Sequence, residues 1–196
     1  DEETLMFQRR VAGEKLKATR EARRIMGDIG FAYGGSDLDR DYPIETEGDV
    51  YREGMQFGPS LSFTYMPVPK IGVKAVTGIG FLSGEARDVI EIPLLLGPVA
   101  FFPSEKFDLF FGVLPGISYC SPFDAEGQTF GPYLREDILL NWGAVFYRYG
   151  DFDEALRYVK LEMQLGLIGA TTDIDFSDPE RAGFVARFNL SIGRRL

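Results

Sequence analysis

The chain has 196 residues, of which 45% are hydrophobic and 26% charged, so it can bury a sizeable core and we expect one domain. Its 21 Lys and Arg residues face 30 Asp and Glu, a net charge of −9, which argues against nucleic acid as a partner. The chain has no histidine, which excludes a Ser-His or Cys-His catalytic pair, and its single cysteine, Cys120, excludes an internal disulfide and a thiolate zinc cluster. We therefore expect that the protein is not an enzyme and binds no cofactor.

The first predicted element is a helix in a basic head. Phe7, Val11, Ala18 and Ala22 recur at helical spacing, which predicts a helix over Phe7–Arg23. Residues 1–26 carry seven basic and five acidic side chains. No uninterrupted run of about 18 apolar residues occurs, so no transmembrane helix is expected. The chain begins at Asp1 without a charged-then-apolar leader, so either a signal peptide has been removed or the N-terminal boundary was chosen.

Eight segments of alternating residues follow, separated by clusters of Gly, Pro, Asp and Ser. In the segment 56–65, Phe57, Leu61 and Phe63 share one face, and the other face holds only Gln, Gly, Ser and Thr. The predicted strands are 25–33, 56–65, 70–82, 90–102, 107–119, 138–147, 158–168 and 184–195. Because proline deletes a ladder donor, bulges or strand breaks are predicted at Pro59, Pro93, Pro98 and Pro115.

The composition of the two strand faces predicts a membrane barrel. A soluble sandwich or carrier barrel would carry Lys, Glu and Thr opposite its apolar face. Here the opposite face is mostly Gly, Ser and Ala with sparse charges, which suits the crowded interior of a narrow barrel, whereas the band of Phe, Leu, Ile and Val suits hydrocarbon. We therefore predict an all-β fold, an eight-stranded antiparallel up-and-down transmembrane β-barrel over residues 25–196, with a short periplasmic helical extension over 1–24.

The connections and the aromatic residues fit this prediction. Short connections alternate with longer ones, as expected of short periplasmic turns and longer outer loops. Aromatic residues near the strand ends predict two girdles at the membrane interfaces. One rim would hold Tyr65, Phe101, Phe102, Phe107, Tyr147 and Tyr158, and the other Tyr33, Phe57, Phe81, Tyr119 and Phe184.

Ionisable residues on the inward face form a balanced set of three acids and three bases. In a barrel of about eight strands side chains fill the lumen, so these charges are expected to pair and close the pore. A proton or ion path is the alternative. The set is Asp28, Lys74, Glu91, Lys160, Glu162 and Arg187.

Two further groups are candidate binding residues. Acids in two outer loops could form a weak cation site, although the first loop fails the EF-hand pattern, and solvated loop charge is the alternative. The acids are Asp37, Asp39, Asp41, Asp173 and Asp175. The basic head could dock on a protein partner or lie on anionic lipid. Its docking residues would be Phe7, Arg10, Val11, Lys17 and Arg20.

Two stretches resemble a known family. Glu-Ile-Pro-Leu-Leu-Leu at 91–96 and Lys-Phe-Asp-Leu-Phe-Phe-Gly-Val-Leu-Pro-Gly-Ile-Ser-Tyr at 106–119 are similar to the small bacterial outer-membrane barrels of the PorT-like group. The first strand and the closing residues 184–196 resemble it as well. The resemblance implies an eight-stranded barrel of the Gram-negative outer membrane with no catalytic motif. The chain departs from the pattern in its basic head and in ending at Leu196 rather than at an aromatic residue.

These observations favour a non-enzymatic outer-membrane barrel with a closed lumen, a structural or accessory subunit of an envelope assembly. Its expected partners are outer-membrane lipid and a protein of a larger envelope complex. The alternative is a soluble lipocalin-like barrel that binds an apolar small molecule. An envelope hydrolase that uses Asp and Ser alone is a third, weaker hypothesis.

Overall fold

The computed structural model describes residues 2–37, 54–83, 88–104, 107–123, 132–148, 156–170 and 182–196. It begins with a helix, α1 (Glu2–Ala22), which is followed by strands only. The strands are β1 (Ile25–Asp37), β2 (Gly54–Val68), β3 (Ile71–Gly78), β4 (Gly80–Ser83), β5 (Asp88–Pro103), β6 (Phe107–Phe123), β7 (Tyr133–Tyr147), β8 (Leu156–Ala170) and β9 (Ala182–Arg195). Over these residues, no helix combines the length and the apolar character that crossing a bilayer requires.

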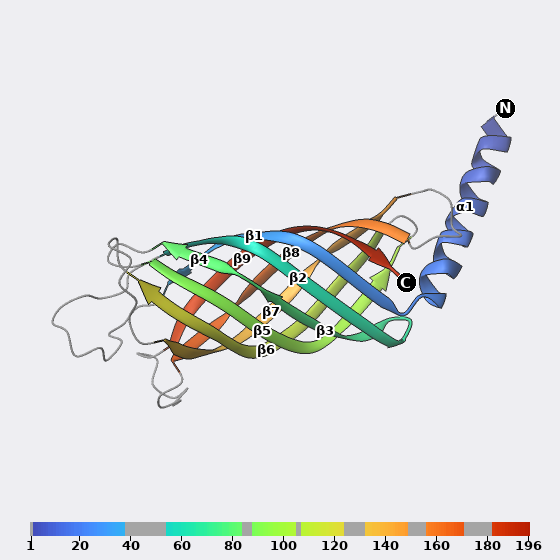
Figure 1. Cartoon of the computed structure of the whole chain (residues 1–196). Coiled ribbons are helices and arrows are strands. Elements are labelled where there is room, and N and C mark those ends of the chain that lie inside the picture. Colours follow the sequence, from blue (N-terminus) through green and yellow to red (C-terminus); the bar gives the residue numbers. More distant parts are fainter. Residues whose placement is uncertain are drawn as a thin grey trace.

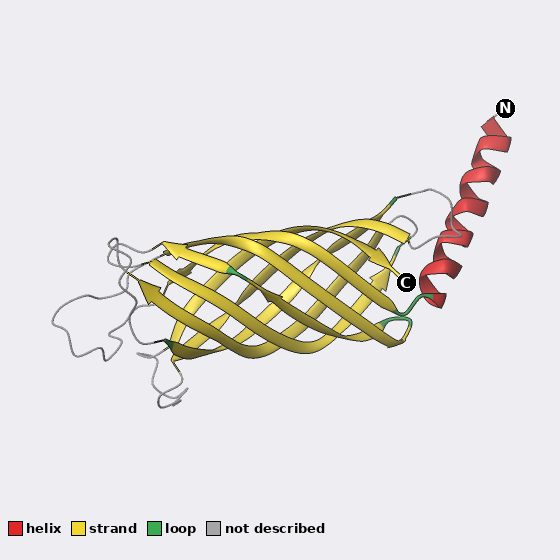
Figure 2. Cartoon of the chain, in the orientation of Figure 1, coloured by secondary structure: helices red, strands yellow, loops and turns green. Residues whose placement is uncertain are grey.

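The strands form one closed antiparallel barrel (Figures 1 and 2). Neighbours in the chain pair with each other, and β1 pairs with both β2 and β9, which closes the ring. The short strands β3 and β4 both lie between β2 and β5, so they are two parts of one wall strand interrupted at Ile79. The wall therefore has eight strands, which confirms the predicted fold class. Each of the eight predicted segments overlaps one of these wall strands.

The ladder is interrupted beside the prolines, as predicted. Ile79 lies opposite Pro59, and its N–H donates to the Pro59 carbonyl at 3.0 Å. On the other side of this break, Pro93 of β5 has no partner in β3 or β4, and the pairing of β5 with β3 begins at Leu94. Between β5 and β6 the pairing likewise omits residues 96–98 and 113–115, which include Pro98 and Pro115. The register is the same on both sides of each gap, so these are breaks and not bulges.

We use two names for the ends of the barrel. The turn end is where β2 meets β3, β5 meets β6 and β7 meets β8, and the loop end is opposite to it. The chain enters the barrel from α1 at the turn end and also finishes there, as the C mark in Figure 1 shows. The Ile25 N–H donates to the Leu196 carbonyl at 3.0 Å, and the Leu196 N–H donates to the Ile25 carbonyl at 2.7 Å.

Apolar side chains cover the outside of the barrel, and polar ones fill much of the inside. Ile29, Leu94 and Ile192 are 64%, 58% and 68% exposed, whereas Lys74 and Glu91 are 2% and 0% exposed. This arrangement suits an exterior in hydrocarbon, as the face composition predicts.

The girdle prediction is right at the loop end and partly wrong at the turn end. All five aromatic residues predicted for the loop-end rim are exposed. At the turn end, Phe101, Tyr147 and Tyr158 are buried in the lumen. Tyr65 and Phe102 are exposed, as predicted. Because successive side chains in a strand point to opposite faces, Phe146 points outward in place of Tyr147.

Helix α1 contacts the barrel, which the sequence pattern did not predict. Leu16 is fully buried and Arg20, one turn later, is 2% exposed, so these two residues carry the contact. Phe7, on the predicted stripe, is 68% exposed. In Figure 1 the helix leaves the turn end with its N-terminal half pointing away from the barrel.

Candidate functional site

The lumen of the barrel contains three groups of buried polar and charged side chains. Strand alternation points all their barrel residues inward, because every second residue of each strand faces the lumen. We call them the mouth network (Arg20, Asp108, Tyr147, Arg195), the central network (Asp28, Ser62, Lys74, Asn141, Tyr158, Lys160, Glu162, Gln164) and the loop-end network (Gln56, Glu91, Ser118, Arg135, Asp137, Arg187).

Ion pairs hold the central network together. Lys160 Nζ lies 2.7 Å from Asp28 Oδ1 and 3.0 Å from Glu162 Oε2. Lys74 Nζ reaches the same Glu162 oxygen from across the lumen at 2.6 Å. The Asn141 amide donates to the other Glu162 oxygen at 2.6 Å. Two lysines therefore balance two carboxylates, and each charge has more than one polar partner.

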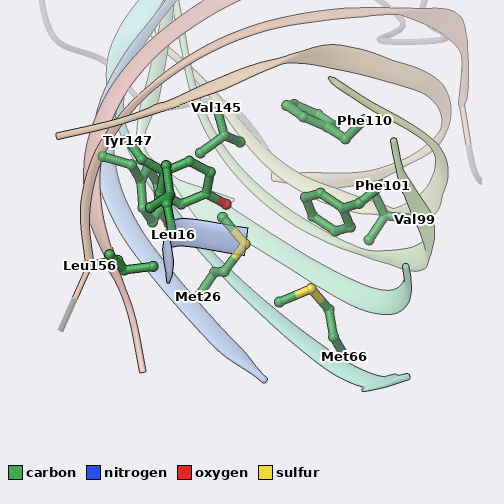
Figure 3. Close-up of a cluster of buried hydrophobic side chains, with 10 residues drawn as sticks. Leu16, Met26, Met66, Val99, Phe101, Phe110, Val145, Tyr147 and Leu156 are labelled. Atoms are coloured by element: carbon green, nitrogen blue, oxygen red, sulfur yellow. The ribbon is translucent and has the colours of Figure 1, made fainter. Parts of the chain in front are cut away.

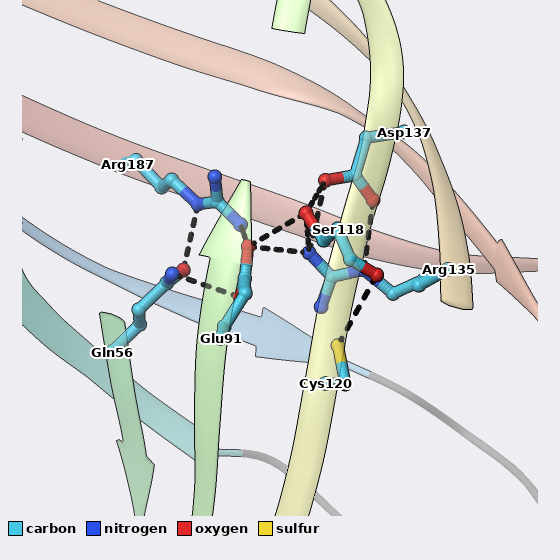
Figure 4. A network of polar contacts seen from close by, with 7 residues as sticks. All are labelled: Gln56, Glu91, Ser118, Cys120, Arg135, Asp137 and Arg187. Carbon is cyan, nitrogen blue, oxygen red and sulfur yellow. Dashed lines mark hydrogen bonds and ion pairs between the residues drawn. The ribbon is translucent and has the colours of Figure 1, made fainter. Parts of the chain in front are cut away.

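The loop-end network is organised around one carboxylate, as Figure 4 shows. Glu91 Oε1 accepts from Arg135 Nη2 at 2.8 Å and from Arg187 Nη2 at 2.6 Å. Arg135 Nε also pairs with Asp137 Oδ1 at 2.7 Å. The Ser118 hydroxyl lies between the two acids, 2.6 Å from Asp137 Oδ2 and 3.0 Å from Glu91 Oε1. Two arginines thus balance two acids in this network as well.

The mouth network joins α1 to the barrel. Asp108 Oδ1 pairs with Arg20 Nη1 at 2.5 Å, and its other oxygen pairs with Arg195 Nη1 at 3.0 Å. The Tyr147 hydroxyl donates to Asp108 at 2.7 Å. Arg20 also donates to the Ser104 carbonyl at 2.6 Å. A residue of the helix is therefore bound inside the turn-side mouth, which α1 covers.

Apolar clusters fill the space beside these networks. One cluster surrounds Leu16 of α1 at the turn end, as Figure 3 shows. Its members are Leu16, Met26, Met66, Val99, Phe101, Phe110, Val145, Tyr147, Leu156 and Tyr158. A second cluster lies further toward the loop end and comprises Val76, Leu95, Leu114, Leu139, Ile168 and Val185. Along β7, Leu139 of this cluster stands between Asp137 and Asn141, so it separates the central and loop-end networks there.

The six predicted lumen charges are all buried, and each lies in an ion pair. The predicted set is incomplete, because the described lumen holds five further buried charges: Arg20, Asp108, Arg135, Asp137 and Arg195. Alternation alone could have found Asp108 and Arg195, which share the inward face of segments 107–119 and 184–195. Arg135 and Asp137 were missed because the predicted strand began at Ile138, whereas β7 begins at Tyr133.

The predicted docking face needs one correction. Arg20 is not available to a protein partner, because it is 2% exposed and paired with Asp108 inside the barrel. Phe7, Arg10 and Lys17 are exposed, and Val11 is half-buried. The predicted face therefore keeps only its N-terminal part and Lys17.

The predicted cation site lies outside what the structure describes. Asp39, Asp41, Asp173 and Asp175 are not among the described residues, and of Asp37 only the backbone is described, at the end of β1. This site stays a prediction. Among the described residues, no three His, Cys, Asp or Glu side chains gather as metal ligands would.

The geometry allows charge pairing and steric closure, and two cavities lined by described residues are small. One cavity, of about 30 Å³, lies beside the wall break and is lined by Gln56, Gln164, Arg187 and Asn189 among others. Another, of about 10 Å³, lies between α1 and the mouth, beside Lys17, Arg20 and Lys70. Spaces of this size hold about one water molecule each, not a large solute.

Comparison with solved structures places the fold among small outer-membrane barrels. The chain is similar to Ail, the attachment invasion locus protein of Yersinia pestis, with a TM-score of 0.54 and 14% identity over 89% of this chain and 99% of that one. It is also similar to Neisserial surface protein A, with a TM-score of 0.53 and 11% identity over 88% and 96% of the two chains. No protein-family model matches the sequence, and no curated protein matches it.

Proposed function

We propose that this chain is a non-enzymatic protein of the Gram-negative outer membrane, a closed barrel that serves as an accessory subunit of an envelope assembly. The observation that carries the proposal is the combination of an apolar exterior with a lumen crossed by paired charges. An open pore needs a continuous watery path, which the three networks and the two apolar clusters of the lumen oppose. The PorT-like resemblance of residues 91–119 supports the same assignment.

Heat modifiability of the purified full-length chain tests the membrane barrel. A closed ladder resists detergent, so a folded membrane barrel migrates differently before and after boiling. We expect a clear mobility shift, together with resistance to extraction by carbonate or salt. Identical mobility of boiled and unboiled samples, or release from membranes without detergent, would contradict the proposal.

Planar-bilayer recording tests the closed lumen separately. We expect no stable conductance from the full-length chain, because the buried charges in the lumen form ion pairs with one another and their side chains fill the path of an ion. A large, stable ion current would show that the lumen conducts and would favour the ion-path alternative.

The proposal includes docking of α1 on a protein partner. Its support is the apolar surface that the free end of the helix exposes: Leu5, Met6 and Phe7 are 53%, 65% and 68% exposed. A full-length L5S/F7S variant should insert normally but lose co-purification with the partner. Undiminished co-purification would refute docking through this end. These substitutions leave Leu16 and Arg20 in the mouth, whereas removal of residues 1–24 would also uncap the barrel.

The soluble-carrier alternative requires the opposite distribution of side chains. A lipocalin-like carrier lines its cavity with apolar residues and exposes polar ones. In this barrel Lys74 and Glu162 are buried in the interior, and the exterior carries Ile29 and Ile192 at 64% and 68% exposure. Such an apolar surface would aggregate in water, which favours the membrane barrel.

A further inference from the structure

The outer surface of the turn end carries a row of three arginines. Arg157 on β8 lies directly opposite Arg194 on β9 in the strand register. On the other side of β8, the Arg148 N–H donates to the Arg157 carbonyl at 3.0 Å, which places Arg148 next in the same row. All three side chains are exposed, and they point outward because their neighbours in the chain point into the lumen.

The three positive charges of this row repel one another. Like charges directly opposite each other on adjacent strands destabilise a sheet. Among the described residues, no ion pair involves any of the three arginines. An anion bound from outside the chain would remove the repulsion.

The surroundings of the row indicate which anion fits. The next outward residues toward the middle of the barrel are Phe146, Val159 and Ile192, which are 44%, 42% and 68% exposed. Beside Arg194 on β1 lies Gly27, and no atom lies within 4 Å of the position that its Cβ would occupy. The row thus forms the polar edge of the apolar band, with open space next to it. A lipid that joins an anionic group to acyl chains matches both parts.

We propose that Arg148, Arg157 and Arg194 bind the phosphate group of an anionic glycerophospholipid whose acyl chains lie against Phe146 and Val159. The planar guanidinium group donates two parallel hydrogen bonds to phosphate oxygens. Basic clusters at the membrane surface are known to attract anionic headgroups. The inference rests on the proposed function, because only a membrane-spanning barrel brings this row to the headgroup level.

Native mass spectrometry of the full-length chain in an uncharged detergent, titrated with phosphatidylglycerol, tests this site. The variant R148Q/R157Q/R194Q removes the row. The control K15Q/K70Q removes two exposed positive charges from the same end, lies outside the predicted docking face of α1 and leaves the row intact. We expect the row variant to lose about tenfold or more in apparent lipid affinity, the scale of a lost charge-assisted hydrogen bond, and the control to bind like the unmodified chain.

Thermal unfolding gives a second readout, because lipid should reverse the difference in unfolding temperature between the row variant and the unmodified chain. Without lipid, the row variant should unfold at the same temperature as the unmodified chain or at a higher one, because repulsion is removed. With phosphatidylglycerol it should unfold at a lower temperature, because bound lipid stabilises only the unmodified chain. If the triple variant does not fold, R157Q alone provides the same comparison.

Several results would overturn the site. The row variant could bind phosphatidylglycerol as tightly as the unmodified chain, or the lysine control could lose as much affinity as the row variant. The unmodified chain could also bind phosphatidylcholine as tightly as phosphatidylglycerol, or inorganic phosphate alone could stabilise it as much as the lipid does. The gel mobility shift separates this inference from the proposed function. A row variant that keeps its shift but binds lipid normally refutes the arginine site only, whereas an unmodified chain without a shift refutes the membrane barrel itself.

Discussion

Lys74 on β3 and Glu162 on β8 meet across the lumen, with Lys74 Nζ 2.6 Å from Glu162 Oε2. The two strands are not neighbours in the sheet, and they stand on opposite sides of the ring. The pair therefore ties one wall to the other in a way that no ladder hydrogen bond does. Both side chains are almost completely buried, so neither charge has water to replace its partner.

The variant Lys74→Met should lower the free energy of unfolding by about 3 to 5 kcal/mol, because it leaves two acids in the central network with one lysine. Urea unfolding in lipid vesicles, followed by the fluorescence of the single tryptophan, Trp142, measures this change. The double variant K74M/E162Q removes both charges and should recover most of the loss. A K74M variant as stable as the unmodified chain would show that the pair contributes nothing.

The variant Asp108→Asn should free α1 from the barrel mouth. Asp108 is the shared partner of Arg20 and Arg195, so its loss leaves two buried arginines without a carboxylate. Hydrogen exchange in residues 14–22 should become faster, because the last turns of the helix lose their anchor.

Arg10→Ala is the control for this prediction. Its partner is Glu14 at 3.5 Å, and both side chains are mostly exposed, so exchange in residues 14–22 should not change. Unaltered protection of these residues in the Asp108→Asn variant would mean that Leu16 alone holds the helix in place.

The variant Glu91→Ala should destabilise the loop end by about 3 to 5 kcal/mol, since Arg135 and Arg187 both donate to this carboxylate. The repulsion between the two arginines should also produce brief current openings in planar bilayers. Glu136→Ala, which removes an outward and half-buried acid from the same end, should do neither. If the two variants have the same stability and the same conductance, Glu91 does not help to close the lumen.

The variant Gly143→Ala should impair folding, because a Cβ there would lie under 3.0 Å from the Leu161 carbonyl oxygen on the neighbouring strand. That atom belongs to the backbone and cannot move aside without breaking the ladder. Gly169→Ala is the matched change on β8, where no atom lies within 4 Å of the new Cβ. The fraction of protein that refolds to the heat-shifted band measures both, and equal yields would contradict the prediction.

Much of the barrel could be predicted from the sequence because its signal is local. A period of two in Val159, Lys160, Leu161 and Glu162 assigns each side chain to one face of β8, whatever the rest of the chain does. The small residues opposite the apolar band then indicate an interior too narrow for large side chains. The eight strands and the inward charges follow from this pattern.

The local sequence pattern gave the wrong prediction where a tertiary contact buries a charged residue that would ordinarily be exposed to solvent. Arg135 and Asp137 look like part of a polar loop, yet they lie buried in β7 because Glu91 and Ser118 complete their hydrogen bonds. Arg20 looks like a solvated residue of a basic helix, but Asp108 holds it inside the barrel. In each case the partner lies far away in the sequence.

By itself, then, the sequence determined which side chains face the lumen and which face outward, because alternation along a strand needs only neighbouring residues. Only the tertiary structure decided which inward charges meet. That choice depends on how the strands tilt and stagger when the sheet closes, which brings Lys74 of β3 to Glu162 of β8 and Arg187 of β9 to Glu91 of β5. It also decided that three outward arginines form one row, because the register between β7, β8 and β9 sets them side by side.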